Sequence, residues 1–135
     1  MLALNDFCRS AVNEGRIALA TTGEQRRDFV SISDIIQALE LTLSIASPLD
    51  PIYNVGGDNV LSIRELAQRV VEVAEKDYGR RIHLEIPSKG GHPAVSWMPF
   101  RFDRIKKLGY HPKNAKDETR EAIRALFHLL GWERR

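Results

Sequence analysis

The fold is decided by residues 25–34, whose sequence is QRRDFVSISD. Two adjacent arginines and an aspartate run into an apolar segment over residues 29–32, which predicts a short extended piece with its charged end at the edge of the fold. Either Ser33 or Asp34 is expected to cap the helix that follows, with Gln37 as the reciprocal partner of Asp34 in a capping box. The segment therefore predicts a charged strand end followed directly by a helix.

The helix after Asp34 carries little polar surface, so we predict that it is buried on most sides. Its apolar residues are Ile35, Ile36, Ala38, Leu39, Leu41, Leu43 and Ile45. A proline-containing turn ends it, and residues 52–55, Ile-Tyr-Asn-Val, predict a short strand. That strand ends at Gly56 and Gly57, where the backbone can take a positive φ or let a ligand come close.

The remaining elements follow from apolar spacing and capping residues. Ser62 and Glu65 form a capping box, and Leu61 and Leu66 are placed as a hydrophobic staple, which together fix a helix start. Further helices are expected over residues 4–15, over 103–108 with Asp103 as the N-cap, and from 113 to 131; further strands are expected over 16–21 and 83–86. Four to five helices with three to four short strands predict a mixed α/β or α+β fold for a single domain over residues 1–135.

Length and composition narrow the class of protein. The chain has 135 residues, 43% hydrophobic and 28% charged, as expected of an ordinary soluble globular domain. A net charge of +2 with interspersed signs is too balanced for a general nucleic-acid binder. No apolar run is long enough to span a membrane and residues 1–4 do not resemble a signal peptide, so we expect a cytoplasmic location and no membrane partner.

Several kinds of catalytic site are missing from the sequence. Cys8 is the only cysteine and lies on an apolar helical stripe, which favours a buried structural thiol over a nucleophile. The four histidines have no ligand spacing with Cys8 or with each other, so no metal site is predicted. No Gly-x-Gly-x-x-Gly loop is present to cradle a dinucleotide, and no tyrosine is followed four residues later by lysine. These residues predict a binding domain without its own catalytic apparatus.

Three places could bind a ligand. Arg26 and Arg27 offer planar charged forks for a phosphate or carboxylate, although one of them could instead pair with Asp28 or Asp34. Asn54 lies at a predicted strand end, where side chains point into crevices but where turn residues are also common. The sequence from Lys89 to Pro93, Lys-Gly-Gly-His-Pro, could present an ammonium and an imidazole, or it could be a plain solvent loop.

The order of four motifs resembles a known family. They are Gly-x-Gln-x-Arg-Asp-Phe-Val followed by Ser-x-x-Asp, then Ile-Tyr-Asn-Val-Gly-Gly, then Leu-Ser-Ile-Arg-Glu-Leu, and finally Asp-Arg-Ile-Lys-Lys-Leu-Gly-Tyr-His-Pro at residues 103–112. Together they resemble the C-terminal, substrate-binding portion of the NAD-dependent epimerase/dehydratase family, the extended short-chain dehydrogenases that act on nucleotide sugars. The resemblance covers nearly the whole chain.

The resemblance implies a set of substrate contacts. Arg27 would bind the pyrophosphate of the sugar nucleotide, Asn54 would lie near the nucleotide, and Ala18 and Ala20 would line the base pocket together with Ile17. Lys89 and His92 stand where the family usually carries a phosphate-binding Arg-x-Gly-Asp/His arrangement, so a point charge replaces a fork there.

The resemblance also implies what this sequence lacks. The Rossmann domain with its glycine-rich loop and catalytic set would lie N-terminal to it, so NAD(P) is expected on that missing domain and no cofactor on this chain. A nucleotide sugar is the expected substrate, and the missing cofactor domain or a homo-oligomer is the expected partner. The alternative function is a non-catalytic helical assembly module derived from such an enzyme. A missing partner domain should leave an unusually large apolar patch exposed.

Overall fold

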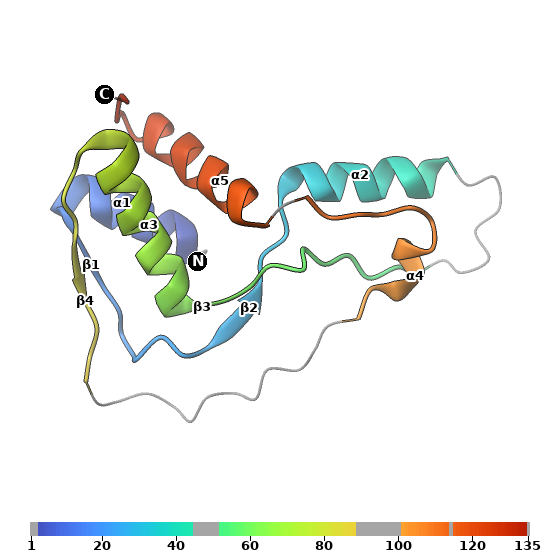
Figure 1. Ribbon diagram of the computed structural model, residues 1–135, viewed down its shortest axis with the longest axis horizontal. Coiled ribbons are helices and arrows are strands. Elements are labelled where there is room, and N and C mark those ends of the chain that lie inside the picture. Colours follow the sequence, from blue (N-terminus) through green and yellow to red (C-terminus); the bar gives the residue numbers. More distant parts are fainter. Residues whose placement is uncertain (1–2, 45–51, 89–100, 114, 135) are drawn as a thin grey trace.

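A computed structural model describes residues 3–44, 52–88, 101–113 and 115–134, and within these ranges the chain forms five helices and four short strands (Figure 1). In order, they are α1 (Ala3–Glu14), β1 (Arg16–Ala18), β2 (Arg26–Asp28), α2 (Ile32–Leu43), β3 (Val60–Ser62), α3 (Ile63–Tyr78), β4 (His83–Glu85), α4 (Asp103–Lys106) and α5 (Ala115–Leu129). The predicted mixed α/β fold is confirmed. No described helix is long and apolar enough to cross a bilayer.

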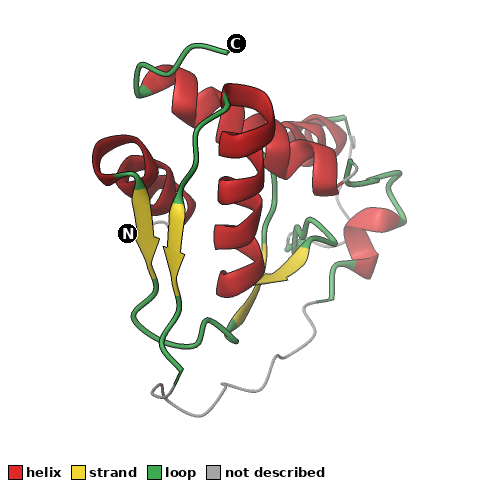
Figure 2. Cartoon of the chain, turned by 60° about the vertical axis from the view of Figure 1, so that its left-hand side comes forward, coloured by secondary structure: helices red, strands yellow, loops and turns green. Residues whose placement is uncertain are grey.

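The strands form two separate pairs. β1 runs parallel to β4 with Ile17 opposite Leu84, and β2 runs antiparallel to β3 with Arg27 opposite Leu61 (Figure 2). The second strand thus comprises the charged residues 26–28, and the prediction of an extended strand over residues 29–32 is wrong. The pairing stops after one more bond, from the Phe29 N–H to the Asn59 carbonyl, because α2 begins at Ile32.

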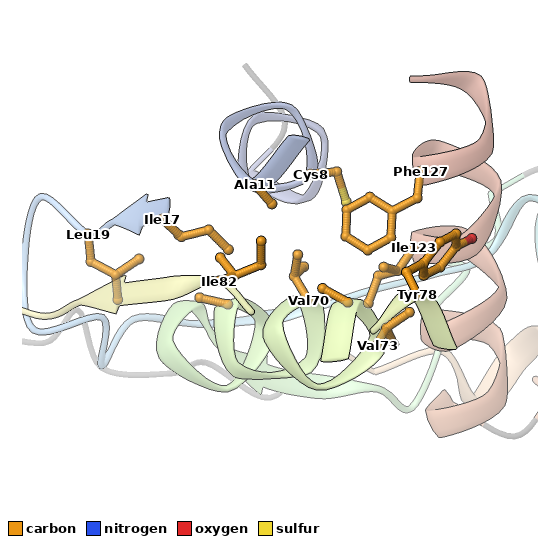
Figure 3. Close-up of a cluster of buried hydrophobic side chains, with 12 residues drawn as sticks. Cys8, Ala11, Ile17, Leu19, Val70, Val73, Tyr78, Ile82, Ile123 and Phe127 are labelled. Atoms are coloured by element: carbon orange, nitrogen blue, oxygen red, sulfur yellow. The ribbon is translucent and has the colours of Figure 1, made fainter. Parts of the chain in front are cut away.

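The main core lies between α1, α3, α5 and the β1–β4 pair. Its fully enclosed side chains include Cys8, Ile17, Val70, Ile123 and Phe127, which converge from these elements in Figure 3. Burial raises the pKa of the Cys8 thiol to about 12. The cysteine is therefore the structural, unreactive residue that the sequence predicts.

The start of α3 follows the prediction in detail. The Ser62 hydroxyl accepts a hydrogen bond from the Glu65 N–H at 3.0 Å, and the Glu65 carboxylate accepts one from the Ser62 N–H at 2.6 Å. The second of these bonds lowers the pKa of Glu65. Leu61 and Leu66 are both buried, as expected of a staple, and Gly79 ends the helix in the left-handed conformation with φ 63°.

The start of α2 differs from the prediction. Ser31 is the N-cap and accepts from the Asp34 N–H at 3.1 Å, so neither Ser33 nor Asp34 caps the helix. The Asp34 carboxylate is buried and accepts from the Lys113 N–H at 3.0 Å. The Gln37 side chain likewise accepts from the backbone of the segment after α4 rather than completing a capping box.

The burial predicted for α2 is also wrong. Ile32 and Leu43 are 81% and 84% exposed, and the helix lies apart from the bundle of α1, α3 and α5 (Figure 1). Only one side of it contacts a small second core, formed by Ala38, Phe102, Ile105 and Tyr110. The face that the sequence pattern assigned to the interior is thus an exposed apolar surface.

Two further predictions need correction. Residues 52–55 do not form a strand, and the described residues provide no strand partner for them. α4 is a single turn whose N-cap is Phe102, with no side-chain cap; the Asp103 carboxylate instead accepts from the Arg101 guanidinium at 2.8 Å. By contrast, α1, α5 and both strands of the β1–β4 pair lie where expected, although β1 and β4 are shorter than predicted.

The contact between α3 and α5 predicts a pH-dependent stability. Hydrogen bonds from Arg120 and Arg124 lower the pKa of Asp77 from 3.8 to about 2. The stabilisation is therefore complete above pH 3.8 and disappears as the pH falls through about 2. Replacing Asp77 with asparagine should cost about 1 kcal/mol of unfolding free energy near neutral pH, allowing for solvent screening at the exposed end of the pair.

Urea denaturation at several pH values would measure this contribution. The difference between parent and Asp77→Asn should vanish near pH 2, whereas Glu75→Gln, an exposed change two residues earlier in α3, should show no such dependence. An Asp77→Asn difference that stays constant from neutral pH to pH 2 would contradict the ionic origin of the contact.

Candidate functional site

The candidate site forms where the end of β2 meets the loop over residues 54–59 and the segment before α4. Asp28 joins the first two, because its carboxylate accepts from the Gly57 N–H and from the Asn59 N–H, each at 2.9 Å. Asn59 is buried, and its side-chain amide donates a hydrogen bond to the Thr119 hydroxyl on α5 at 2.9 Å. Asp28 therefore fixes the backbone from which Arg27 projects.

The two adjacent arginines have different surroundings. The Arg26 guanidinium donates to the Val60 carbonyl at 3.0 Å and lies 3.5 Å from the Glu65 carboxylate. Arg27, whose side chain leaves the strand on the opposite side, donates to the Arg26 carbonyl at 2.8 Å and is exposed. Within the described part of the chain no carboxylate pairs with Arg27.

The alternative that Arg26 or Arg27 pairs with Asp28 or Asp34 is thus wrong, because the carboxylate that pairs with Arg26 belongs to another residue. Arg26 does form an ion pair, but with Glu65 of the α3 capping box, and the carboxylates of Asp28 and Asp34 accept from backbone N–H groups. This arrangement leaves the charge of Arg27 available to an external anion.

Asn54 lies at the rim of a surface hollow. Its side-chain amide donates to the Arg101 carbonyl at 3.1 Å. The hollow, which we call the Asn54 hollow, has a volume of about 410 Å³ and is lined by Ile52, Asn54, Arg101, Phe102, Asp103 and Arg104. Asn54 thus borders a concave surface, one of the two placements that the sequence leaves open, but it does so from an irregular segment rather than from a strand end, and its role near a nucleotide stays a prediction.

The two glycines after this segment allow close packing within the protein. Neither has a positive φ. A Cβ on Gly56 would lie 2.6 Å from the Phe102 ring, and a Cβ on Gly57 would lie 2.1 Å from the Phe29 carbonyl oxygen. The close approach expected here is therefore made by the protein itself. The buried Tyr110 hydroxyl also donates to the Gly56 carbonyl at 2.8 Å, and burial raises the pKa of Tyr110 to about 12.

The other predicted site residues are not joined to this junction. Ala18 ends β1 and Ala20 follows it two residues later. Both alanines are exposed, whereas the alternating residues Ile17 and Leu19 are buried. Ala18 belongs to the β1–β4 pair and Arg27 to the β2–β3 pair, so a role of Ala18 and Ala20 in a base pocket stays a prediction. Lys89 and His92 lie outside the described residues.

Sequence reasoning missed two residues of the junction. Arg101 borders the Asn54 hollow, and its side chain is 84% exposed beside Asp103. Its position between two phenylalanines, Phe100 and Phe102, was the available signal. Tyr110 lies within the Leu-Gly-Tyr-His-Pro motif, and nothing in the neighbouring sequence indicates that its hydroxyl reaches the Gly56 carbonyl. The described residues contain no group of three or more acidic, histidine or cysteine side chains that could hold a metal ion.

No protein-family model and no curated protein matches the sequence. Solved structures do match. RMD from Pseudomonas aeruginosa, solved with NADPH, is 18% identical to this chain and matches it with a TM-score of 0.74. The match covers 95% of this chain and 43% of the RMD chain. UDP-glucuronic acid 4-epimerase from Bacillus cereus, solved with UDP-glucuronic acid and NAD, is 20% identical with a TM-score of 0.70, covering 95% and 40%.

A third match is dTDP-glucose 4,6-dehydratase from Bacillus anthracis, solved with NAD, at 15% identity and a TM-score of 0.70, covering 96% of this chain and 39% of its own. The chain thus spans about two fifths of the length of these enzymes. At such identities the likeness establishes the fold. The protein has the fold of the C-terminal part of the NAD-dependent epimerases and dehydratases, the extended short-chain dehydrogenases that its motifs resemble.

Proposed function

We propose that this chain is the substrate-binding part of an NAD(P)-dependent nucleotide-sugar epimerase or dehydratase, and that Arg27 binds the pyrophosphate of the sugar nucleotide. The observation that carries the proposal is the difference between the two arginines. Arg26 is engaged by the Val60 carbonyl and by Glu65, whereas the exposed Arg27 has only a backbone carbonyl as a partner among the described residues.

The local structure suits Arg27 to an anion. One Nη of its guanidinium is held by the Arg26 carbonyl, which restrains the side chain and leaves its other N–H groups to donate to phosphate oxygens. Asp28 keeps the strand end in place through two backbone hydrogen bonds. The Asn54 hollow, which is bordered by a side-chain amide and two arginines, is a second polar surface of the described chain, but Arg27 is not among the residues that line it.

The start of α3 does not fit the pyrophosphate of NAD(P). β3 leads directly into α3, which is the arrangement that holds a dinucleotide pyrophosphate in other folds. Here the N–H groups at the start of α3 are already bonded: Ile63 donates to the Gln25 carbonyl and Arg64 to the Gly23 carbonyl, each at 3.0 Å, and the Glu65 N–H donates to the Ser62 hydroxyl. We therefore assign hydride transfer to another part of the enzyme, and this chain is not catalytic alone.

Calorimetric titration with UDP-, GDP- and dTDP-sugars tests the proposal. Arg27→Ala should weaken the binding of the preferred nucleotide sugar by roughly 10- to 100-fold, because a charge-assisted hydrogen bond contributes about 1.5–3 kcal/mol. Arg27→Lys should recover only part of the affinity, since an ammonium cannot form the planar fork.

The matched control is Arg81→Ala, which removes the same charge from an exposed position beside β4. Equal binding by Arg27→Ala and the parent chain would overturn the role of Arg27. Absence of binding by the parent chain to all three classes of nucleotide sugar would favour the alternative, a non-catalytic assembly module.

A further inference from the structure

A pocket between α3 and α5 lies apart from the candidate substrate site. The two helices pack against each other (Figure 1), and the pocket, which we call the α3–α5 pocket, has a volume of about 60 Å³. Its lining consists of Arg69, Glu72, Val73 and Lys76 from α3 and of Lys116, Asp117, Arg120 and Ile123 from α5. None of these residues belongs to β2 or lines the Asn54 hollow.

The lining of the α3–α5 pocket is predominantly cationic. Four of its side chains are positively charged at neutral pH and two, Glu72 and Asp117, are negatively charged, so the lining has an excess of two positive charges. Asp77 pairs with Arg120, but it also pairs with Arg124, which lies outside the lining and balances its charge. The pocket therefore has the net charge that suits a dianion.

The cations of both helices converge on one carboxylate of the lining. A hydrogen bond from the Lys76 ammonium to Glu72 at 2.6 Å, together with the positive charges of Lys76, Lys116 and Arg120, lowers the pKa of Glu72. An external anion in the pocket would be stabilised by the same positive charges, because they favour any negative charge placed near them.

Arg69 and two apolar side chains give the pocket a fixed shape. One Nη of Arg69 donates to the buried Thr119 hydroxyl at 3.2 Å, which restrains the guanidinium while its other nitrogens still carry N–H groups for a ligand. Val73 and Ile123 are buried and therefore form the base of the pocket. An apolar base excludes water from one side of a bound ion and so strengthens its contacts with the cations.

The volume of the pocket limits the size of the ligand. One water molecule needs about 10–15 Å³ of such space, so the pocket holds roughly four to six water-sized groups. A tetrahedral oxyanion with four oxygens matches this number. A whole nucleotide sugar does not fit, because pockets for ligands of that size have volumes of about 300 Å³ or more.

We propose that the α3–α5 pocket binds a single phosphate group, either as free phosphate or as the terminal group of a phosphorylated metabolite. The Arg69 guanidinium and the Lys116 ammonium donate to its oxygens from opposite helices, and Arg120 and Lys76 add to the positive field. This site is separate from the pyrophosphate contact proposed for Arg27 and does not depend on it.

Calorimetric titration of the Arg27→Ala chain with inorganic phosphate, at an ionic strength held constant with sodium chloride, tests the inference. This background removes the other proposed phosphate contact. One phosphate per chain should bind saturably at millimolar concentration, and sulfate should compete whereas chloride should not. Lys116→Gln should weaken binding about 10-fold, because it removes one charge and one donor. Lys116 is exposed in the first turn of α5, so this variant keeps the fold.

Glu72→Gln should change the phosphate affinity in the opposite direction. It removes a carboxylate that repels the ligand, so binding should tighten by about 3- to 10-fold, an effect that damage to the fold would not produce. Lys107→Gln and Glu40→Gln are the matched controls, because they make the same charge changes at exposed residues outside the pocket. Both should bind phosphate as the Arg27→Ala chain does.

A hexose phosphate distinguishes the two sources of the phosphate group. If it binds as tightly as inorganic phosphate, the pocket takes a phosphorylated metabolite; if it binds more than about 10-fold more weakly, the ligand is free phosphate. Absence of saturable phosphate binding would overturn the inference, and so would an affinity that neither Lys116→Gln nor Glu72→Gln changes.

Failure of this inference can be told apart from failure of the proposed function. Lys116→Gln in the otherwise unchanged chain should bind nucleotide sugars as the parent does, whereas Arg27→Ala should still bind phosphate in the α3–α5 pocket. Each variant thus reports on one proposal alone.

Discussion

Replacing Gly57 with alanine is expected to lower the free energy of unfolding by about 3 kcal/mol or more. The new methyl group would lie 2.1 Å from the Phe29 carbonyl oxygen and 2.9 Å from the Phe29 carbonyl carbon. Both atoms belong to the backbone, so no change of rotamer relieves the overlap. The loop would have to move away from β2 and break the bond from the Gly57 N–H to Asp28. Urea denaturation followed by circular dichroism measures the loss.

Gly15→Ala provides the control for this substitution. Gly15 has φ 66°, but a Cβ there would meet no atom within 4 Å, so only the cost of the left-handed backbone applies, about 1 kcal/mol. Gly57→Ala should exceed it clearly. Equal losses for the two variants would contradict the close approach of the glycine loop to Phe29, and with it the way in which Asp28 supports Arg27.

Phe127→Ala should cost about 3–5 kcal/mol of unfolding free energy. The Phe127 side chain is completely buried, with its ring centroid 5.3 Å from that of Tyr78 and 4.6 Å from that of Trp132. Truncation would leave a cavity between α3, α5 and the C-terminal segment, because three aromatic rings there pack on one another. Equilibrium denaturation in urea, with an unchanged m-value, would measure the effect.

Leu129→Ala, two residues along the same helix, is the matched control. Leu129 is 80% exposed, so the change should alter stability by less than about 0.5 kcal/mol. If Phe127→Ala were as mild as Leu129→Ala, α5 would not be held to the core by the aromatic cluster. Nucleotide-sugar affinity per folded molecule should be unchanged in both variants, since neither residue borders the candidate site.

Where structure depends on neighbours in the sequence, the prediction from residues succeeds. The start of α3 is fixed by Ser62 and Glu65, three positions apart, and the end by Gly79. α5 follows from an apolar spacing that places Thr119, Ile123 and Phe127 on one buried stripe. These signals lie within one or two turns of helix, so no tertiary contact is needed to interpret them.

The start of α2 shows why local signals can fail. Three oxygen-bearing side chains within four residues, those of Ser31, Ser33 and Asp34, compete for the same cap. A tertiary contact separates them: the backbone N–H of Lys113, 79 positions further along the chain, donates a hydrogen bond to the Asp34 carboxylate, so that Asp34 is not the cap. The exposure of α2 could not be predicted from the sequence either. The apolar spacing of a helix is the same whether its apolar side is buried by the rest of the chain or left exposed.

The candidate site divides in the same way. The motif around Arg27 pointed to an exposed charge at a strand edge, but the separation of roles between Arg26 and Arg27 depends on Glu65, which is distant in sequence. Residues 52–55 have strand-forming side chains yet form no strand, since pairing needs a partner that the described chain does not supply. Propensity alone cannot create that partner.

The buried cysteine has a practical consequence for experiments on this protein. Cys8 is fully buried, and burial raises the pKa of its thiol, so thiol-directed reagents should leave the folded chain unmodified at neutral pH. A cysteine placed at any exposed position would then react alone. Spin labels or fluorescent dyes can thus be attached one at a time, on α2 or beside Arg27, without first removing a native residue from the core.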